Sequence, residues 1–236
     1  ETIAKFPPGA LQFEIGIQSF NPEVQALVSR KQDNAKAADN IRWLCEQSHA
    51  HLHVDLIAGL PGEDVDSFAR GFDQLVALKP HEIQFGILKR LRGTPIIRHT
   101  SEFGMVFDPY PPYTILATRD VDFGAMQRLV RFARYWDLVA NSGRFANTIP
   151  QMLGESPFHN FMAFSDWIYT KTDATHRIAL DRLAKLVAEW LHVRGMSRDD
   201  ANALVASDYA GRVDAPAAKP AAAVAAPARQ TRHLAA

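Results

Sequence analysis

Three stretches of the chain, at residues 13–20, 51–57 and 82–88, alternate apolar residues with polar or small ones. A period of two is typical of β-strands, because successive side chains point to opposite faces of a sheet. We therefore predict three strands, each with one apolar and one polar face. The residues on the predicted polar faces are Glu14, Gly16, Gln18, His51, His53, Asp55, Gln84 and Gly86.

Helical patterns separate these strands. Asn21 followed by proline predicts the start of a short helix over residues 22–29. Asp33 or Asn34 predicts the cap of a second helix, and residues 67–78 have the apolar spacing of a third. The order of strand, helix, strand, helix and strand predicts an α/β fold whose parallel strands are joined by helical crossovers.

The polar faces distinguish between two α/β architectures. Strands of an open, doubly wound sheet are covered on both faces and are mostly apolar throughout. In a barrel one face of each strand points inward, and a polar interior indicates a cavity that holds a ligand. We therefore predict a partial β/α barrel that contributes three βα units and has a ligand inside. An open sheet with one solvated face is the alternative.

The second half of the chain has a different pattern. Residues 104–118 are rich in proline and tyrosine, which predicts a loop or a short edge strand. Helices are predicted over residues 123–140, 149–153, 160–169, 175–193 and 198–207. The aromatic residues that we expect to pack between these helices are Phe158, Phe161, Phe164, Trp167 and Trp190.

These changes of pattern divide the chain into three predicted parts. A partial barrel covers residues 1–118, and an all-α domain covers residues 119–211. Residues 212–236 are rich in alanine and proline, so they offer too little apolar surface to offset the entropy of ordering them. We predict that this last part is a disordered tail.

Composition narrows the functional classes only slightly. Lys and Arg together number 26, as do Asp and Glu, so the net charge gives no reason to expect a nucleic acid or an anionic membrane as a partner. No apolar run approaches the roughly 20 residues of a membrane helix. We recognise no signal peptide, and we expect a cytoplasmic protein.

The chain has a single cysteine, Cys45. One cysteine excludes an intrachain disulfide framework and fits a reducing compartment. Cys45 belongs to the apolar stripe of the predicted second helix, so we expect a buried structural thiol rather than a ligand or a nucleophile.

Three motifs follow one another along the predicted strands: Gly-Ile-Gln-Ser-Phe-Asn-Pro-Glu-Val at residues 16–24, Val-Asp-Leu-Ile-Ala-Gly-Leu-Pro-Gly-Glu at residues 54–63, and a third strand that ends in Leu-Lys before Gly-Thr-Pro at residues 93–95. In this order they resemble the last three strands of a radical S-adenosylmethionine barrel. The chain resembles the branch that contains oxygen-independent coproporphyrinogen oxidases, and it also resembles the cobalamin-binding radical enzymes. The resemblance covers about residues 10–145.

The resemblance implies roles for individual residues, since this family binds S-adenosylmethionine across the carboxyl ends of the strands. It implies that Gln18 contacts the ribose or the methionine part, that Arg30 binds the methionine carboxylate or the ribose, and that Asp55 binds the ribose hydroxyls. Lys89 falls where the family makes a backbone contact near the adenine. Gly59 belongs to a turn that lets the backbone approach the ligand. The alternatives are that Arg30 is a solvated residue at a helix end and Lys89 an ordinary surface lysine.

The resemblance also implies a [4Fe–4S] cluster, which this family holds with three cysteines. This chain has one cysteine. We therefore expect the chain alone to hold no cluster and to be inactive in radical cleavage. The cluster cysteines, and a cobalamin site if there is one, are expected in a missing N-terminal half of the same polypeptide. The expected partner is a small-molecule substrate or one of unknown class, and no residue identifies it.

Two other functions are compatible with the sequence. His51, His53 and Asp55 have a spacing that resembles the metal ligands of hydrolase barrels, although they precede the carboxyl end of their strand. The chain is alternatively a non-catalytic binding or interaction module. Arg90 and Arg92 would suit an anionic substrate. The alternative is that they belong to a solvated loop and bind nothing.

Overall fold

The computed structural model describes residues 2–210, so the predicted tail at 212–236 lies outside the described residues. The elements are, in chain order, η1 (Ile3–Lys5), β1 (Gln12–Gln18), α1 (Pro22–Leu27), α2 (Asn34–Gln47), β2 (His51–Ala58), α3 (Val65–Ala77), β3 (Glu82–Ile87), η2 (Pro95–His99), β4 (Val106–Phe107), β5 (Ile115–Ala117), α4 (Phe123–Trp136), η3 (Asp137–Asn141), α5 (Ile149–Leu153), α6 (Pro157–Thr172), α7 (Leu180–Val193) and α8 (Arg198–Ala210).

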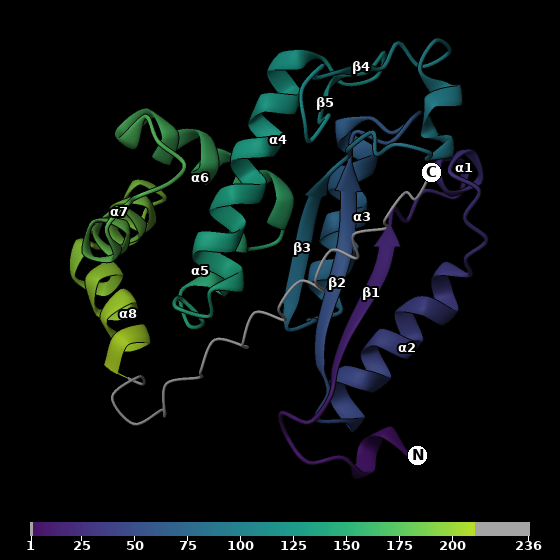
Figure 1. The fold of residues 1–236 in the computed structure, drawn as a ribbon. Coiled ribbons are helices and arrows are strands. Elements are labelled where there is room, and N and C mark those ends of the chain that lie inside the picture. The colour runs from purple at the N-terminus through teal and green to yellow at the C-terminus, as the bar shows by residue number, and fades with distance from the viewer. Residues whose placement is uncertain (1, 211–236) are drawn as a thin grey trace, which may run out of the picture.

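The three predicted strands form one parallel sheet in the order β1, β2, β3. Gly16 pairs with Asp55 and Asp55 pairs with Gln84, so these predicted polar residues share one face, whereas Gln18 pairs with Leu56 after a shift of register. On the other face Val54 and Leu56 are fully buried, and Figure 1 shows α3 behind this sheet. The α/β prediction is confirmed, whereas the partial barrel remains a prediction.

Side-chain caps fix where the first helices begin. The Asn21 side chain accepts hydrogen bonds from two backbone N–H groups of α1, and Asp33 caps α2 by accepting from the Lys36 N–H. Asp64 accepts from the backbone N–H of Ser67 at 2.7 Å. This cap starts α3 at Val65, two residues before the predicted start.

The Pro- and Tyr-rich segment folds back onto the exit of β3. Strands β4 and β5 pair antiparallel, which confirms the prediction of a short edge strand in this segment. The backbone N–H of Ile115 donates to Leu88 at 2.9 Å, and that of Arg90 donates to Tyr113 at 3.0 Å. The chain that leaves β3 is therefore held by an additional antiparallel contact.

The helical region packs directly against the sheet, with α4 beside β3 (Figure 1). The predicted helix over residues 123–140 is an α-helix only to Trp136 and continues as the π-helical turn η3. This turn presents Asn141, whose side chain accepts from the Ile83 N–H at 3.2 Å and donates to the Ile83 oxygen at 3.0 Å. One side chain thus occupies the edge of β3 where a further strand would pair.

Another boundary was predicted wrongly. The helix expected over residues 175–193 begins at Leu180. Arg177 has a φ of 58°, in the left-handed region, and this backbone conformation interrupts a right-handed helix.

Aromatic side chains join the sheet to the helices. Phe132 of α4 is fully buried, with ring centroids 5.2 Å from Phe72 of α3 and 4.9 Å from Phe85 of β3. The predicted packing role is confirmed for the buried residues Phe158, Phe161, Phe164 and Trp190, and Trp167 is partly buried. One continuous core therefore crosses the boundary predicted at residue 118.

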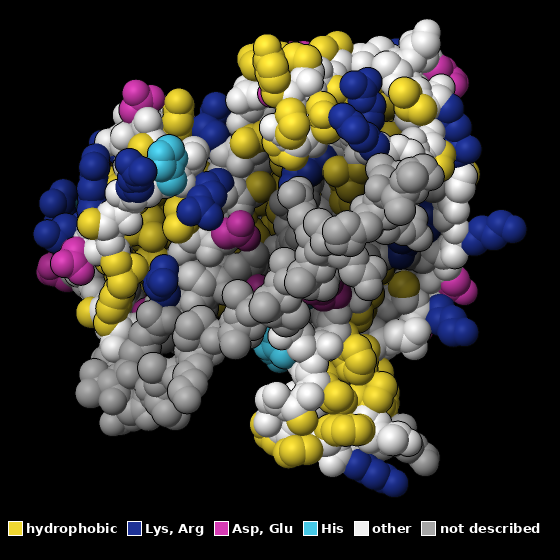
Figure 2. Space-filling model, in the orientation of Figure 1, with side chains coloured by type: hydrophobic (Ala, Val, Ile, Leu, Met, Phe, Trp, Pro, Cys, Tyr) yellow, Lys and Arg dark blue, Asp and Glu magenta, His cyan; other side chains and the backbone are white. Residues whose placement is uncertain are grey.

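Two surface features bear on the expected function. Cys45 is only half-buried, so the prediction of a buried thiol was wrong. In Figure 2 basic side chains lie at several separate places on the visible face, with acidic ones among them. Among the described residues, no helix is both long enough and apolar enough to cross a membrane.

Candidate functional site at the polar face of the sheet

Gln18 is the last residue of β1 and lies at a bulge. The pairing register shifts between Gly16 and Gln18, so that Gln18 pairs with Leu56. Its φ of 67° is in the left-handed region. Residues other than glycine rarely adopt this conformation, and those that do are frequently found at functional sites. The bulge changes the direction of the chain at the carboxyl end of β1, immediately before α1.

Asp55 lies in the middle of β2, on the polar face. Its Oδ1 atom is buried and has no hydrogen-bond partner among the described residues. Burial raises the pKa of the Asp55 carboxyl above its ordinary value, the nearby Glu14 raises it further, and His53 opposes both. Since buried polar atoms in folded proteins are nearly always paired, this oxygen is a point where an external hydrogen-bond donor would be stabilised.

Arg30 reaches the same face from the turn after α1, three residues beyond the end of this helix. Its Nη2 donates to the backbone oxygen of Gly16, and its Nε donates to Gln32 Oε1 at 2.9 Å. Nη2 also lies 3.8 Å from the place that a Cβ on Gly16 would occupy. Because Gly16 pairs with Asp55, the guanidinium lies over the strand adjacent to this aspartate. These contacts hold Arg30, so it is not simply a solvated residue at a helix end.

Lys89 is placed away from this group. It is exposed and lies two residues beyond the end of β3. Asp55 pairs with Gln84, which is five residues before Lys89, so the two positions are about 16 Å apart along the strand direction. The structure therefore brings Arg30 to the strand beside Asp55 and leaves Lys89 distant. Gln18 pairs with Leu56, the residue that follows Asp55 on β2, and no contact joins its side chain to Arg30 or Asp55 among the described residues.

Packing alone explains why residue 59 is a glycine. Its φ of 87° is one that side chains rarely permit, and a Cβ at this position would lie 2.6 Å from Cγ2 of Ile115 and 3.1 Å from Cε of Met126. The close approach of β5 and α4 to the end of β2 therefore requires glycine here.

A surface cavity of about 520 Å³ lies at the exit of β3. The Arg90 guanidinium is 5.1 Å from the centroid of the Phe107 ring, which fixes one wall. The residues that line the cavity are Arg90, Leu91, Arg92, Gly93, Thr94, Ile97 and Tyr113. Gln18, Asp55 and Lys89 are not among them, so this cavity does not unite the predicted site residues.

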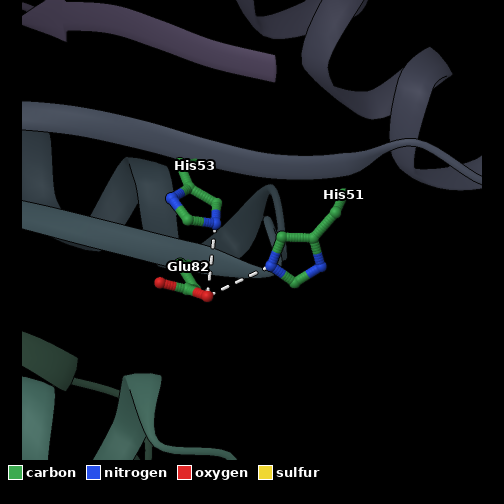
Figure 3. Close-up of side chains that lie close together, drawn as sticks. All are labelled: His51, His53 and Glu82. Carbon is green, nitrogen blue, oxygen red and sulfur yellow. Dashed lines mark hydrogen bonds and ion pairs between the residues drawn. The ribbon is translucent and has the colours of Figure 1, made fainter. Parts of the chain in front are cut away.

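The residues that could bind a metal ion in the structure differ from the alternative set that was named from the sequence. Possible ligand atoms of His51, His53 and Glu82 lie within 4.8 Å of one another, and Figure 3 shows the two imidazoles directed at one carboxylate. Asp55 is not part of this group. In place of Asp55 of the alternative set, the structure brings the carboxylate of Glu82 from the neighbouring strand to His51 and His53.

The family model for a protein of unknown function, DUF4080, matches residues 101–223, which is 123 of the 236 residues. The chain belongs to the DUF4080 family. The match covers the helical region and the β4–β5 pair, and it begins after the three parallel strands.

Curated relatives of this DUF4080 chain match a shorter segment. The oxygen-independent coproporphyrinogen III oxidase of Pseudomonas aeruginosa is 33% identical over 75 residues, which is 32% of this chain and 16% of that enzyme. The enzyme of the same name from Paracoccus denitrificans is 33% identical over 78 residues, covering 32% and 17%. Anaerobilin synthase of Escherichia coli O157:H7 is 37% identical over 60 residues, covering 25% and 14%.

These similarities support a relationship of the DUF4080 chain to the radical S-adenosylmethionine enzymes that its motifs resemble. The relatives reported give no support to cobalamin binding. The matched segment spans only about a sixth of the length of these relatives, so their activities cannot be carried over whole.

The DUF4080 chain does not provide the ligands of an iron–sulfur cluster. Its one cysteine, Cys45, is on α2 with its Sγ 3.6 Å from the backbone oxygen of Lys79. Burial raises the pKa of this thiol, which disfavours the thiolate that a cluster needs, and Glu46 adds to the effect. One thiol does not fit a cluster held by several cysteines.

Sequence reasoning missed a buried network that connects two of the quoted motifs. Ser19 Oγ donates to Glu63 Oε1 at 2.5 Å, and the Asn21 N–H donates to Ser19 Oγ at 3.0 Å. Burial, partly opposed by the Ser19 hydrogen bond, raises the pKa of Glu63 to about 7. The signal in the sequence was the position of Glu63 directly after Gly-Leu-Pro-Gly. Its partner Ser19 lies 44 residues earlier, and the spacing of residues did not indicate this pairing.

Proposed function

We propose that this chain is a portion of a radical S-adenosylmethionine enzyme and that β1, β2 and the turn after α1 contribute part of the S-adenosylmethionine site. The observation that carries the proposal is the buried, unpartnered Oδ1 of Asp55, which lies on a polar sheet face beside the strand that Arg30 contacts. The similarity to radical enzymes over a short segment supports the same assignment.

The proposed contacts follow from the chemistry of the side chains. Two neighbouring ribose hydroxyls donate to a carboxylate, so Asp55 would gain the partner that its Oδ1 lacks, and the ionised form would be stabilised against the effect of burial. Arg30 presents a planar guanidinium that suits a carboxylate or ribose oxygens. Gln18, at the bulge, offers both an amide donor and an acceptor.

The cluster belongs to residues outside this chain in this proposal. S-adenosylmethionine yields a radical when a reduced [4Fe–4S] cluster supplies one electron. The residues described above bind and orient the cofactor, and no redox step is assigned to them.

The substrate side is proposed at the exit of β3. Arg90 and Arg92 line the cavity of about 520 Å³ together with Tyr113. Two guanidinium groups in one cavity favour an anionic substrate. This cavity lies beyond the carboxyl end of a parallel strand, which is where α/β proteins bind their ligands.

Equilibrium dialysis of the chain with S-adenosylmethionine tests the cofactor assignment. We expect binding that weakens about tenfold to a hundredfold in Asp55→Ala, because a hydrogen bond to a charged group contributes about 1.5–3 kcal/mol. Arg30→Ala should weaken binding as well. Asp39→Ala is the matched control, since Asp39 is exposed on α2 and pairs only with Arg42 of the same helix among the described residues.

Two results would contradict the assignment. One is the absence of S-adenosylmethionine binding, which would favour a non-catalytic interaction module. The other is binding that Asp55→Ala and Asp39→Ala leave equally strong, which would place the ligand elsewhere on the chain.

A further inference from the structure

Two histidines and one glutamate converge at the amino end of the polar sheet face. His51 and His53 are alternate residues of β2, and Glu82 is the first residue of β3. His53 pairs with Glu82 in the parallel register, so their side chains leave the sheet on the same side. The convergence thus follows from strand pairing and not from a flexible loop.

The distances in this group match a small coordination sphere. His51 Nε2 is 3.1 Å and His53 Nε2 is 3.2 Å from the same atom, Glu82 Oε1. Zinc bonds to nitrogen and oxygen of about 2.1 Å place neighbouring tetrahedral ligands about 3.4 Å apart. Each imidazole nitrogen therefore needs to move only a few tenths of an ångström away from Glu82 Oε1 for an ion to enter. All the possible ligand atoms of the three residues already lie within 4.8 Å of one another.

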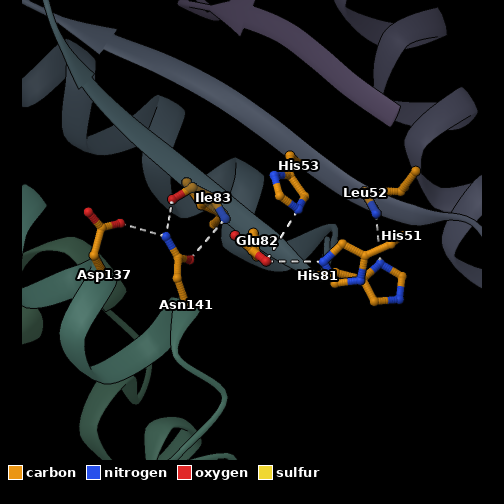
Figure 4. Close-up of polar contacts among 8 residues, drawn as sticks. All are labelled: His51, Leu52, His53, His81, Glu82, Ile83, Asp137 and Asn141. Carbon is orange, nitrogen blue, oxygen red and sulfur yellow. Dashed lines mark hydrogen bonds and ion pairs between the residues drawn. The ribbon is translucent and has the colours of Figure 1, made fainter. Parts of the chain in front are cut away.

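Neighbouring residues hold the group in place, as Figure 4 shows. The Leu52 N–H donates to His81 Nδ1 at 3.1 Å, and the His81 ring lies 4.6 Å from the ring of His51. Beside Glu82, the backbone of Ile83 is fixed on both its N–H and its oxygen by Asn141. Both strands are thereby anchored next to the three side chains, so little ordering remains when an ion binds.

The group is also accessible. The side chains of His51, His53 and Glu82 are 42%, 21% and 33% exposed. An ion can therefore enter from solvent, and water can complete its coordination.

We propose that His51 Nε2, His53 Nε2 and Glu82 Oε1 bind one Zn²⁺ ion, with water in the remaining position. Two imidazoles and one carboxylate form a donor set that zinc uses in proteins. Binding requires neutral imidazoles with unprotonated Nε2 atoms and an ionised carboxylate. The Nε2 protons that face Glu82 move to the other ring nitrogens or to solvent. The proposal does not depend on S-adenosylmethionine binding.

Calorimetric titration of the chain with Zn²⁺ alone tests the site. We expect one ion per chain and an affinity that falls at least about tenfold in His53→Ala and in the isosteric Glu82→Gln, because each removes one of three ligands. His176→Ala is the control, since His176 is exposed in the segment between α6 and α7. No binding, or equal losses in all three variants, would overturn the proposal.

A measurement on the unchanged chain guards against variants that fail to fold. Zn²⁺ should raise the thermal unfolding midpoint, EDTA should reverse the rise, and Mg²⁺ at the same concentration should not reproduce it, because an ion that binds only the folded state stabilises it by mass action. Co²⁺ should give the visible absorption of a site with mixed nitrogen and oxygen ligands. An unfolding midpoint that does not respond to Zn²⁺ would show that the three residues form only a hydrogen-bonded cluster.

Discussion

Glu63 gives the sharpest test of the electrostatics at the carboxyl end of the sheet. Glu63 is 2% exposed, and its Oε1 accepts a hydrogen bond from Ser19. Burial raises its pKa from 4.5 to about 7. Glu63→Gln replaces the carboxyl by a neutral group of nearly the same shape, so it removes the titration with little change in packing.

The sign and size of the effect follow from this pKa. The folded state binds the Glu63 proton more tightly than the unfolded state, so the stabilisation is fully present below pH 4.5 and is lost as the pH rises through about 7. A difference of about 2.5 pKa units at about 1.36 kcal/mol each amounts to roughly 3 kcal/mol. Above pH 7 the folded protein carries a buried charge that costs about this amount.

Urea unfolding between pH 5 and pH 8.5 measures the effect as the difference between the wild type and Glu63→Gln at each pH. We expect the variant to be more stable by less than about 1 kcal/mol at pH 5 and by up to about 3 kcal/mol at pH 8. Glu155→Gln, at an exposed glutamate, should keep the pH dependence of the wild type. A difference between wild type and Glu63→Gln that does not change with pH would refute the reasoning, because Glu63 would then be ionised throughout.

Three further changes test the packing, each by urea unfolding. Phe132→Ala should cost about 3–5 kcal/mol, since the ring is fully buried among other aromatic rings; a cost below about 1 kcal/mol would contradict this packing. Gly59→Ala should cost at least about 2 kcal/mol through its positive φ and its contact with Ile115, whereas Gly143→Ala, with a positive φ in open space, should cost less. Asn141→Ala should cost about 2 kcal/mol, because Ile83 loses two hydrogen bonds; no loss would mean that water replaces the side chain.

Local signals in the sequence were sufficient for the strands and for most helix starts. The alternation of apolar and polar residues located β1, β2 and β3 to within two residues at each end, because a half-buried strand imposes that period directly. Asn21 and Asp33 cap helices as predicted, since a cap acts within three residues of itself.

Features that depend on distant parts of the chain were not predictable in this way. The bulge at Gln18 is a change of pairing with β2, and the role of Asn141 depends on η3 ending beside β3. The third member of the histidine group is the clearest case. Asp55 shares a strand face with His51 and His53, but the register across strands places Glu82 opposite His53. Side-chain alternation identifies a face, and only the register identifies the neighbour.

The two proposed sites lie on one sheet face, and their independence can be measured. His53 and Asp55 are two residues apart on β2, roughly 7 Å along the strand, and His53 already opposes the rise in the pKa of Asp55 that burial causes. If Zn²⁺ binds beside His53, its charge should favour ionised Asp55 and strengthen S-adenosylmethionine binding modestly, and by reciprocity the cofactor should strengthen Zn²⁺ binding by the same factor.

Dialysis with S-adenosylmethionine, with and without Zn²⁺, measures this factor. In the His53→Ala chain, Zn²⁺ should not strengthen S-adenosylmethionine binding. Strengthening that persists in His53→Ala would place the ion elsewhere. Zn²⁺ that competes with S-adenosylmethionine would show that the face holds one site, because two separate ligands do not exclude each other. The polar face of β1, β2 and β3 would then act as a single site rather than as two halves with different chemistry.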